Sequence, residues 1–574
     1  MSINRWEVTP LTNQDKSATL IEKLKVPQVI ATLLVNRGID TFEKSKNYFR
    51  PQLTDLHDPF LMEDMDIAVP RLIKALENKE KILIYGDYDV DGTTSVALVY
   101  SYLRNLTDQI DHYQPDRYTE GYGISFQGIE YAKDNNYTLV IALDCGTKAV
   151  DKIAKANEYG IDFIIGDHHT AGEKLPEAFA ILNPKKESCN YPYDELCGCG
   201  IGFKLMQALA IRQNYPIAKV YELLDLVAIA IGADIVPITG ENRVLAYYGL
   251  KQLQKSPRIG VKTMLELANK KGEVTISDLV FTVAPRINAA GRIDSARNAV
   301  ELLLSESPEK ASEWGKIINQ YNSERKEIDK DITSEALRMI ADDTSFAEQK
   351  STVISNSKWH KGVVGIVASR VIEKHYKPTI VLVESDGMAS GSARSVRGFN
   401  VYDAINSCSN LLDRFGGHKY AAGLSLKLEN LEAFKKQFEA AVKSKITPEQ
   451  ETPVLRIDVE LAVEDFKLDL PNQDFPKFYR LIKQMAPFGP LNMTPTFIMK
   501  GMLDAGNSKI VGEEHLRVSI RQEGKDRVFN GIGFGLGEKL DLIKSGSTFD
   551  IVFQLNENNY FGTPELQFLV KDIR

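Results

Sequence analysis

Short apolar runs alternate with amphipathic stretches from about residue 80 onward, and this pattern constrains the fold more than any other feature. Such alternation is typical of βαβ units, in which a strand is followed by a helix and then by a parallel strand. We therefore expect a doubly wound α/β domain over residues 56–310, preceded by an N-terminal extension over 1–55. Its predicted elements are strands at 81–85, 137–143, 162–165 and 178–182 and a helix at 93–106.

A stretch rich in Glu, Lys, Ile and Ala follows that domain, with no Gly or Pro between Gly315 and residue 342. It predicts one long helix, which we expect to connect two domains over 311–345. Beyond it the βα pattern returns and predicts a smaller α/β domain over 346–445. The predicted elements of this second domain are strands at 351–355 and 378–383, a helix at 363–375 between them, and Gly- and Ser-rich turns at 387–391 and 416–417.

Residues 445–453 have the composition of a linker, and strand-like alternation dominates the chain beyond them. The predicted strands include 515–520, 549–553 and 566–569, while the helical signal is mostly confined to about 474–486. A small β-barrel of the OB type over 450–574 fits this pattern, although the number of strands also suits a sandwich.

Composition excludes several classes of protein. With 574 residues, of which 43% are hydrophobic and 26% charged, the chain is neither disordered nor a coiled coil. The longest apolar stretches are interrupted by Asp or Gly and fall short of the roughly 20 residues of a spanning helix, so we expect no membrane span. The N-terminus has no export signal and the five cysteines suit a reducing compartment, so we expect a cytoplasmic protein. A net charge of −8 argues against a basic coat for nucleic acid, although it does not exclude a local one.

Three aspartates directly follow the first predicted strand. Asp87, Asp89 and Asp91 stand at a spacing of two, which places them on one side of an extended chain. Clustered carboxylates repel one another unless a cation offsets their charge, so the motif indicates a divalent metal ion. An Asp-rich turn is the alternative for this motif taken alone.

Further acidic and histidine side chains follow other predicted elements. They are Asp144 after 137–143, Asp167, His168 and His169 after 162–165, and Asp234 after the apolar segment 226–231. In open α/β sheets, ligands bind at the carboxyl ends of the strands. The sequence therefore predicts a metal site at this edge, and a ligand set of Asp and His suits Mn²⁺ or Mg²⁺ better than Zn²⁺ held by thiolates.

The pattern also suggests roles within that site. Because adjacent side chains on an extended segment point to opposite sides, we assign His168 as a metal ligand, which leaves His169 free to meet a phosphate oxygen or protonate a leaving group. Asp167 would then hold one imidazole in place. Two metal ions that share carboxylates would explain the number of aspartates. That arrangement serves in-line phosphoryl displacement, in which one ion generates hydroxide and both stabilise developing charge.

At these positions the chain resembles the DHH phosphoesterase superfamily, which is named for the Asp-His-His found here at 167–169. Four motifs match in order: Gly-Asp-Tyr-Asp-Val-Asp-Gly at 86–92, Leu-Asp-Cys-Gly-Thr at 143–147, Gly-Asp-His-His-Thr at 166–170 and Ala-Asp-Ile-Val-Pro at 233–237. Four further motifs, at 284–292, 359–366, 391–395 and 416–423, are similar to those of the RecJ family. The resemblance covers nearly the whole chain from about residue 25.

The resemblance implies a Mn²⁺- or Mg²⁺-dependent exonuclease that degrades single-stranded DNA processively from the 5′ end to mononucleotides, in recombination and repair. The implied site comprises two ions, the metal ligands Asp89, Asp91, Asp144, His168 and Asp234, and the catalytic groups Asp87, Asp167 and His169. Because Tyr85 stands where many superfamily members have a His, the alignment ranks the second and third aspartates of the first motif above the first as direct ligands. By analogy the protein would be a monomer that works beside a RecQ-type helicase and a single-strand-binding protein.

A nuclease that selects a DNA end must bind a terminal phosphate, and arginine suits bidentate phosphate contacts. The candidate arginines are Arg117, Arg286, Arg292, Arg394 and Arg397. The motifs similar to the RecJ family add Ser392, Ser395, Gly416, Gly417 and His418, and the glycines would allow an anion nest of backbone amides. Candidates for stacking on bases are Tyr118, Tyr122 and Phe399, although core packing is the commoner role for any single aromatic side chain.

The sequence alone leaves two other functions as alternatives. A DHH phosphodiesterase for short oligonucleotides or cyclic dinucleotides, or a pyrophosphatase, would need only the two α/β domains, whereas the residues after 450 favour a polymeric substrate. An inactive nucleic-acid-binding scaffold would be free to lose its metal ligands, yet all four motifs keep their Asp and His residues.

Overall fold

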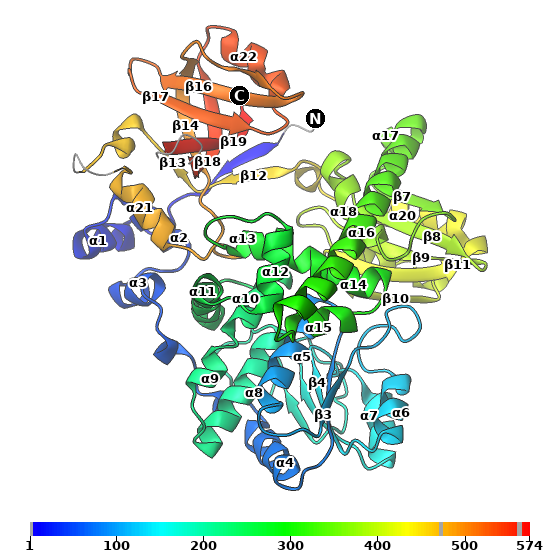
Figure 1. Cartoon of the computed structure of the whole chain (residues 1–574). Helices are drawn as coiled ribbons and strands as arrows, with labels where there is room; N and C mark the ends of the chain where they lie inside the picture. Colours follow the sequence, from blue (N-terminus) through cyan, green and yellow to red (C-terminus); the bar gives the residue numbers. More distant parts are fainter. Residues whose placement is uncertain (1–3, 470–473, 559–564) are drawn as a thin grey trace. The chain divides into compact units, whose positions relative to one another are not determined.

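The computed structural model describes residues 4–469, 474–558 and 565–574 (Figure 1). The chain forms two compact units: one contains residues 1–7 and 320–456, and the other contains residues 8–319 and 457–574. The second unit therefore combines the predicted catalytic region with the C-terminal strands.

A five-stranded parallel sheet forms the centre of the catalytic region, with the strand order β3-β2-β4-β5-β6. Helices α6 (Phe126–Asp134) and α7 (Val150–Glu158) cover one face, and α5 (Val90–Leu103) and α8 (Gly198–Gln213) cover the other (Figure 1). The predicted doubly wound fold is thereby confirmed. The strands are β2 (Ile82–Gly86), β3 (Ile110–Tyr113), β4 (Leu139–Leu143), β5 (Asp162–Gly166) and β6 (Ala180–Leu182).

Helices continue the chain after this sheet. The apolar segment before Asp234 is the helix α10 (Leu224–Ala233), which is buried on all sides against α5, α8 and α11 (Gly240–Lys255). Further along lie α12 (Ile259–Leu267), a π-helical turn at Leu279–Val283, α14 (Ala284–Ile293) and α15 (Arg297–Leu303). A helix with no polar face must be enclosed by other elements, and this explains why the segment lacks an amphipathic pattern.

The long helix α16 (Pro308–Asp342) agrees closely with the predicted helix. In the unit of residues 320–456, a sheet of order β10-β11-β9-β8-β7 packs α18 (Val364–Lys374) and α16 on one face. Helices α19 (Val401–Asn406) and α20 (Leu431–Lys445) cover the other face. The strands are β7 (Thr352–Asn356), β8 (Thr379–Ser385), β9 (Met388–Arg394), β10 (Arg414–His418) and β11 (Ala421–Lys427).

The predicted turn at 416–417 is wrong, because these residues lie inside the edge strand β10. Gly417 has a φ of +143°, and a Cβ there would come within 2.4 Å of the carbonyl oxygen of Ala421. The glycine is therefore required by the close hairpin to β11 rather than by a turn at its own position.

The C-terminal strands close into a five-stranded barrel, because β14 pairs with both β18 and β16 while β19 and β17 complete the circle. This confirms the OB-like barrel over a sandwich. The barrel strands are β14 (Phe497–Asp504), β16 (His515–Gln522), β17 (Val528–Gly533), β18 (Phe549–Asn558) and β19 (Glu565–Ile573). The helix α21 (Lys477–Gln484) falls within the predicted helical stretch, and the short α22 (Leu540–Lys544) was not predicted.

The N-terminal helices share one hydrophobic core with this barrel. These helices are α1 (Gln14–Leu24), α2 (Gln28–Asn36) and α3 (Phe42–Phe49). The side chain of Arg243 on α11 joins them to the catalytic region: its guanidinium lies 3.9 Å over the ring of Tyr48. It also donates to the carbonyl oxygens of Tyr48 at 2.9 Å, Met485 at 3.0 Å and Ala486 at 3.0 Å.

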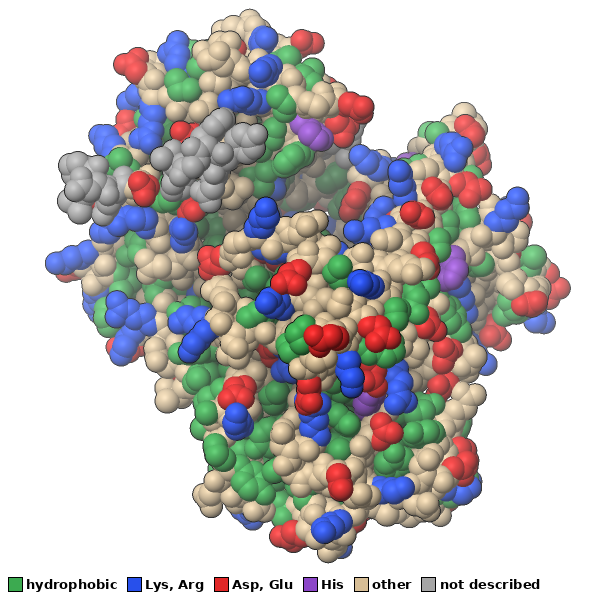
Figure 2. Space-filling view, viewed as in Figure 1, with side chains coloured by type: hydrophobic (Ala, Val, Ile, Leu, Met, Phe, Trp, Pro, Cys, Tyr) green, Lys and Arg blue, Asp and Glu red, His purple; other side chains and the backbone are tan. Residues whose placement is uncertain are grey.

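Acidic and basic side chains are interspersed over the face shown in Figure 2, in agreement with the net charge of −8. Among the described residues, no helix combines the length and the apolar character that crossing a membrane requires.

Candidate active site

The first Asp motif lies where β2 passes into α5. Asp87 is fully buried, and one of its oxygens accepts a hydrogen bond from the amide of Gly123 at 3.1 Å. Asp89 caps the helix by accepting from the amide of Gly92 at 3.0 Å. Asp91 lies in the first helical turn, so the expected extended run of three aspartates is wrong. The helix begins at Val90 because Asp89 supplies a favourable cap.

The carboxylate of Asp91 is held by the start of another helix. Its two oxygens accept from the amides of Gly198 at 2.6 Å and Cys199 at 2.8 Å, which are the first residues of α8. Free amides and the helix dipole at an N-terminus stabilise a carboxylate. This contact fixes the orientation of Asp91 toward the strand ends.

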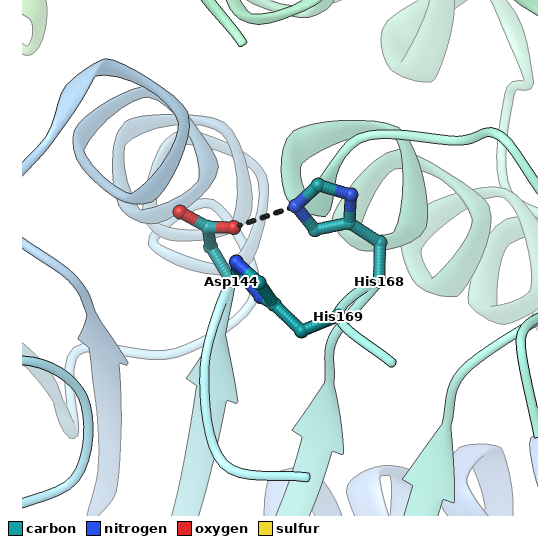
Figure 3. A group of neighbouring side chains, drawn as sticks. All are labelled: Asp144, His168 and His169. Carbon is teal, nitrogen blue, oxygen red and sulfur yellow. Dashed lines mark ion pairs between the residues drawn. The ribbon is translucent and has the colours of Figure 1, made fainter. Parts of the chain in front are cut away.

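His168 stands at the centre of the predicted ligands. Its Nε2 lies 3.2 Å from Oδ1 of Asp144, 3.6 Å from Oδ2 of Asp234 and 3.7 Å from Oδ2 of Asp91. Asp144 follows β4 with a φ of +59°, and Figure 3 shows its carboxylate directed at the His168 ring. The sequence prediction that these four side chains meet at one edge of the sheet thus agrees with the geometry.

His169 also turns toward Asp144, and the ring centroids of the two histidines are 4.6 Å apart (Figure 3). The expected divergence of their side chains is therefore not observed, because β5 ends at Gly166 and the alternation of a strand no longer applies. Nδ1 of His169 lies 2.8 Å from Oδ1 of Asp167, and its Nε2 lies 3.1 Å from the hydroxyl of Tyr122. Asp167 thus orients the ring, as expected.

Burial raises the pKa values of the carboxyl groups at this edge. Burial and then the charge of Asp89 raise the pKa of Asp87 to about 8 and that of Asp91 to about 7. Burial and then the charge of Asp91 raise the pKa of Asp234 to about 8, and the pKa of Asp144 lies well above its usual range. Carboxylates this close together require a nearby positive charge to ionise together.

Several buried atoms here have no hydrogen-bond partner among the described residues: Oδ2 of Asp87, Oδ1 of Asp144 and both ring nitrogens of His168. Although Oδ1 of Asp144 and Nε2 of His168 are 3.2 Å apart, they do not have the geometry of a hydrogen bond. Burial and then the neighbouring His169 lower the pKa of His168 to about 3, so the imidazole is neutral. Neutral imidazole and clustered carboxylates, each with an unused lone pair, fit a divalent cation of the Mn²⁺ or Mg²⁺ type.

A cavity of about 280 Å³ opens in front of the first Asp motif. Its lining contains two of the predicted arginines, Arg117 and Arg292, together with Tyr122 and Asn288. Arg286 does not line it: this side chain is buried and donates to the carbonyl oxygen of Thr282 at 2.7 Å. The lining combines the aspartates of the first motif and Asp234 with Arg117 and Arg292, and this combination suits a phosphodiester with metal ions.

Two asparagines of this region were missed by the sequence analysis. Asn183 directly follows β6 and donates to the carbonyl oxygen of His169 at 2.9 Å and to the hydroxyl of Thr147 at 3.1 Å. Because Asn183 directly follows a predicted strand, its position could have identified it as a residue of this site. Asn288 stands four residues before Arg292 on α14, and that spacing puts both side chains on one helical face.

In the unit of residues 320–456, several of the other substrate-binding candidates share one face of the sheet. Ser392 on β9 is in register with Gly423 on β11, which in turn pairs with Gly416 on β10. In the same way, Arg394 on β9 is in register with Ala421 on β11, which pairs with His418 on β10. A Cβ built at Gly365, in the first turn of α18, would lie 3.0 Å from the guanidinium of Arg394 and 3.2 Å from the hydroxyl of Ser392. A basic and a hydroxyl side chain thus lie beside a helix N-terminus, over strands with small residues.

The remaining candidates lie just beyond β9. The hydroxyl of Ser395 donates to the carbonyl oxygen of Phe399 at 2.9 Å, and Arg397 is exposed. Phe399 is 3% exposed and belongs to the hydrophobic core, so its predicted role in stacking on bases is wrong. Tyr118 and Tyr122 are 44% and 54% exposed.

A parallel sheet that gathers three aspartates around a histidine at its carboxyl edge, followed by a second α/β sheet, defines a phosphoesterase of the DHH class. The DHH family N-terminal domain matches residues 81–231, and the DHHA1 domain matches residues 348–444. The RecJ OB domain matches residues 457–572. These three matches fall on the catalytic sheet, the second sheet and the barrel.

Curated relatives extend over nearly the whole chain. The chain is 37% identical to the single-stranded-DNA-specific exonuclease RecJ of Bacillus subtilis, over 99% of this chain and 70% of that protein. It is 31% identical to the enzyme of the same name from Salmonella typhimurium, over 97% of each. A crystal structure of RecJ in complex with Mn²⁺ from Thermus thermophilus matches with a TM-score of 0.83 and 25% identity, over 99% of this chain and 79% of that one. The chain belongs to the RecJ family of single-stranded-DNA-specific exonucleases.

Proposed function

We propose that this exonuclease hydrolyses single-stranded DNA from the 5′ end to mononucleotides, in DNA recombination and repair, with two divalent ions, Mn²⁺ or Mg²⁺. The observation that carries this proposal is the convergence of Asp91, Asp144 and Asp234 on Nε2 of His168. Oδ1 of Asp144 and both ring nitrogens of His168 have no hydrogen-bond partner among the described residues, and Asp91 and Asp234 line a cavity that also contains arginines. Membership of the RecJ family supplies the substrate class.

The ions would be held by Asp91, Asp144, His168 and Asp234, together with Asp89 at the cavity wall. Divalent ions in such a site lower the pKa of a water molecule and neutralise charge that develops on a phosphate. Two groups of ligand atoms, each within 4.8 Å, both contain His168. One imidazole nitrogen binds a single ion, so the second ion of the proposed pair would be held by the carboxylates.

The side chains around the ions would orient the reacting groups. Asp167 holds Nδ1 of His169, so that Nε2 is directed toward Tyr122 and the strand edge, where it can meet a phosphate oxygen or deliver a proton to the leaving oxygen. The buried Asp87, with one oxygen on the amide of Gly123, would position the attacking water. Arg117 and Arg292 would hold the phosphate from the opposite wall.

The other substrate contacts follow the proposed domains: a catalytic domain at 56–310, the connecting helix at 311–345, a substrate-binding domain at 346–445 and the barrel at 450–574. Ser392, Arg394, Gly416 and His418 share a sheet face and would bind the 5′-phosphate end, with Ser395, Arg397 and Gly417 beside them. Arg286 would contribute indirectly, through its place on α14. The barrel would hold the single strand through charge and stacking.

We also propose a cytoplasmic monomer that acts beside a RecQ-type helicase and a single-strand-binding protein. Family membership supports these partners, and five free cysteines support a reducing compartment.

Digestion of a long single-stranded DNA labelled at either end tests the proposal. With Mn²⁺, mononucleotides should be released from the 5′ end, while a duplex of the same sequence survives and Asp144→Ala is inactive. Turnover of a dinucleotide while the long strand survives would instead identify a phosphodiesterase for small substrates.

A further inference from the structure

Tyr88, the tyrosine of the first Asp motif, makes a contact that the motif itself does not explain. The guanidinium of Arg117 lies 4.0 Å over the Tyr88 ring. Nε of Arg117 donates to the carbonyl oxygen of Gly291 at 3.0 Å. A planar cation that rests on an aromatic face, with one edge bound to a carbonyl, has little freedom to rotate.

The opposite edge of this guanidinium is available for a ligand. No ion pair to Arg117 is present among the described residues, although Asp87 is close enough for the charge of Arg117 to lower the pKa of that carboxyl, against the larger effect of burial. Arg117 and Tyr88 line the cavity that contains Asp89, Asp91 and Asp234. An arginine without a carboxylate partner at the edge of an acidic cavity fits an anionic substrate group.

The same two side chains also line a second cavity, beyond Tyr88, together with Gln114, Asp116 and Gly291. Tyr88 and Arg117 therefore form the partition between the two cavities. Without the ring, the face of the guanidinium that now rests on Tyr88 would have open space. The ring thus limits the positions that the guanidinium of Arg117 can take between the two cavities.

The end of α14 is fitted to this pair. A Cβ at Gly291 would come within 2.8 Å of the carbonyl oxygen of Tyr88, so glycine permits the helix to approach. The hydroxyl of Tyr118 donates to the carbonyl oxygen of Arg292 at 2.5 Å, which joins the loop of Arg117 to the same helix end. The loop and α14 are therefore held together at the residues that line the cavity.

We propose that Tyr88 is a positioning residue: its ring fixes the guanidinium of Arg117 so that the two terminal nitrogens face the phosphate of the nucleotide being removed. Tyr88 stands between Asp87 and Asp89, so one short segment sets the spacing between the arginine and the acidic side chains. This inference rests on the proposed function, because Tyr88 would hold Arg117 in place for the phosphate contact that the proposed function requires. Fixing a catalytic contact in advance lowers the entropy that the transition state must lose.

A double-mutant cycle on the full chain tests this role. Tyr88→Leu should lower kcat/KM for single-stranded DNA by about 10-fold, as expected for loss of a desolvated cation and ring contact. Tyr88→Phe keeps the ring and should recover most of the rate. Arg117→Ala should lose more than Tyr88→Leu, and the double variant Tyr88→Leu/Arg117→Ala should lose no more than Arg117→Ala alone, because Tyr88 acts through Arg117.

Two controls separate this role from general damage. Mn²⁺ affinity, measured by calorimetry, should be the same for Tyr88→Leu and the wild type. On α11, Nζ of Lys251 lies 4.2 Å over the ring of Tyr247, away from the metal ligands. Tyr247→Leu removes this comparable contact and should keep wild-type activity. Equal rates for the wild type, Tyr88→Leu and Tyr88→Phe would overturn the proposal, and so would losses that multiply in the double variant.

The proposed function and the role of Tyr88 fail in different ways. A wild type that cleaves bis(p-nitrophenyl) phosphate but not a DNA strand would contradict the proposed substrate. The same cycle measured on the diester would still decide whether Tyr88 acts through Arg117, because that substrate also presents a phosphodiester.

Discussion

Gly198 packs so closely against Asp144 that a Cβ on Gly198 would lie 2.6 Å from the Cβ of Asp144. The amide of the same glycine donates to Asp91 at 2.6 Å. The first residue of α8 therefore determines the positions of two carboxylates that come from different motifs.

Gly198→Ala should displace Asp144 and weaken Mn²⁺ binding by at least 10-fold, because the added methyl group meets a rigid side chain and backbone. Calorimetric titration with Mn²⁺ measures this change. Gly200→Ala, on the same helix, is the matched control: its Cβ would make only ordinary contacts from 3.5 Å, so it should keep full affinity. Equal affinities for the two variants would contradict the proposed fit.

Asp167→Asn should lower kcat by about 10- to 100-fold at saturating Mn²⁺, in the range seen when a partner that orients a ligand or catalytic histidine is removed. Oδ1 of Asp167 accepts from the amides of His168 and His169 and faces Nδ1 of the His169 ring. Oδ2 accepts from the amide of Thr147 at 2.9 Å. Because the side-chain amide of asparagine has a single accepting oxygen, it cannot serve both sides. Single-turnover digestion measures the loss, and a kcat equal to that of the wild type would show that His169 needs no orientation.

Metal addition should raise the thermal stability of the wild type, since the ions bind only the folded site. Free Mn²⁺ at 100 times its Kd would add about 2.7 kcal/mol to the free energy of unfolding. In the absence of metal, Asp144→Ala should unfold at a higher temperature than the wild type, because it removes a buried carboxyl from an acidic cluster. Calorimetric scans with and without EDTA test both expected changes in stability. If metal-free Asp144→Ala is less stable than the metal-free wild type, the second expectation is wrong.

Arg243→Met should lower the free energy of unfolding by about 3 kcal/mol, because buried carbonyl oxygens on two segments lose their donor. Urea unfolding followed by circular dichroism measures the change. Arg212→Met replaces an exposed arginine on α8 and should cost less than about 0.5 kcal/mol. Comparable losses in both variants would mean that the contacts of Arg243 add nothing to stability.

His375 should make the unit of residues 320–456 sensitive to acid. Burial, and then the nearby Lys377, lower the pKa of His375, so the folded chain binds this proton less tightly than the unfolded chain. Its contribution to stability is complete above the unfolded pKa of about 6.5 and is lost as the pH falls below that value. His375→Gln should therefore lose less stability than the wild type between pH 7.5 and 5.5. Parallel urea titrations at the two pH values measure the loss in the free energy of unfolding for each protein. Identical losses would contradict the prediction.

The catalytic sheet and part of its ligand set could be predicted because Asp144 and the Asp167-His168-His169 motif follow the strands β4 and β5. The positions of Asp144 and His168 depend only on where β4 and β5 end, and the apolar runs mark those ends clearly. The barrel could be predicted as a class from its alternating strands, but its closure depends on the pairing of β14 with β16, which no local pattern encodes.

Other features depend on contacts between distant segments, which a single sequence does not reveal. Asp91 was expected on an extended chain, but the cap at Asp89 starts a helix and turns Asp91 toward α8. Phe399 is aromatic, as a residue that stacks on bases must be, but its side chain packs in the hydrophobic core of its unit. The position of Asn183 after a predicted strand could have indicated it, but its hydrogen bonds to Thr147 and His169 join segments that are far apart in the sequence.

The core shared by the N-terminal helices and the barrel affects how the protein can be divided for experiments. A chain cut before residue 457 would leave the apolar sides of α2 and α3 in water and deprive Arg243 of its carbonyl partners at Met485 and Ala486. Weak DNA binding by such a truncation would report misfolding as much as the loss of a binding surface. Single substitutions on the barrel surface are therefore the sounder way to map its contacts with DNA.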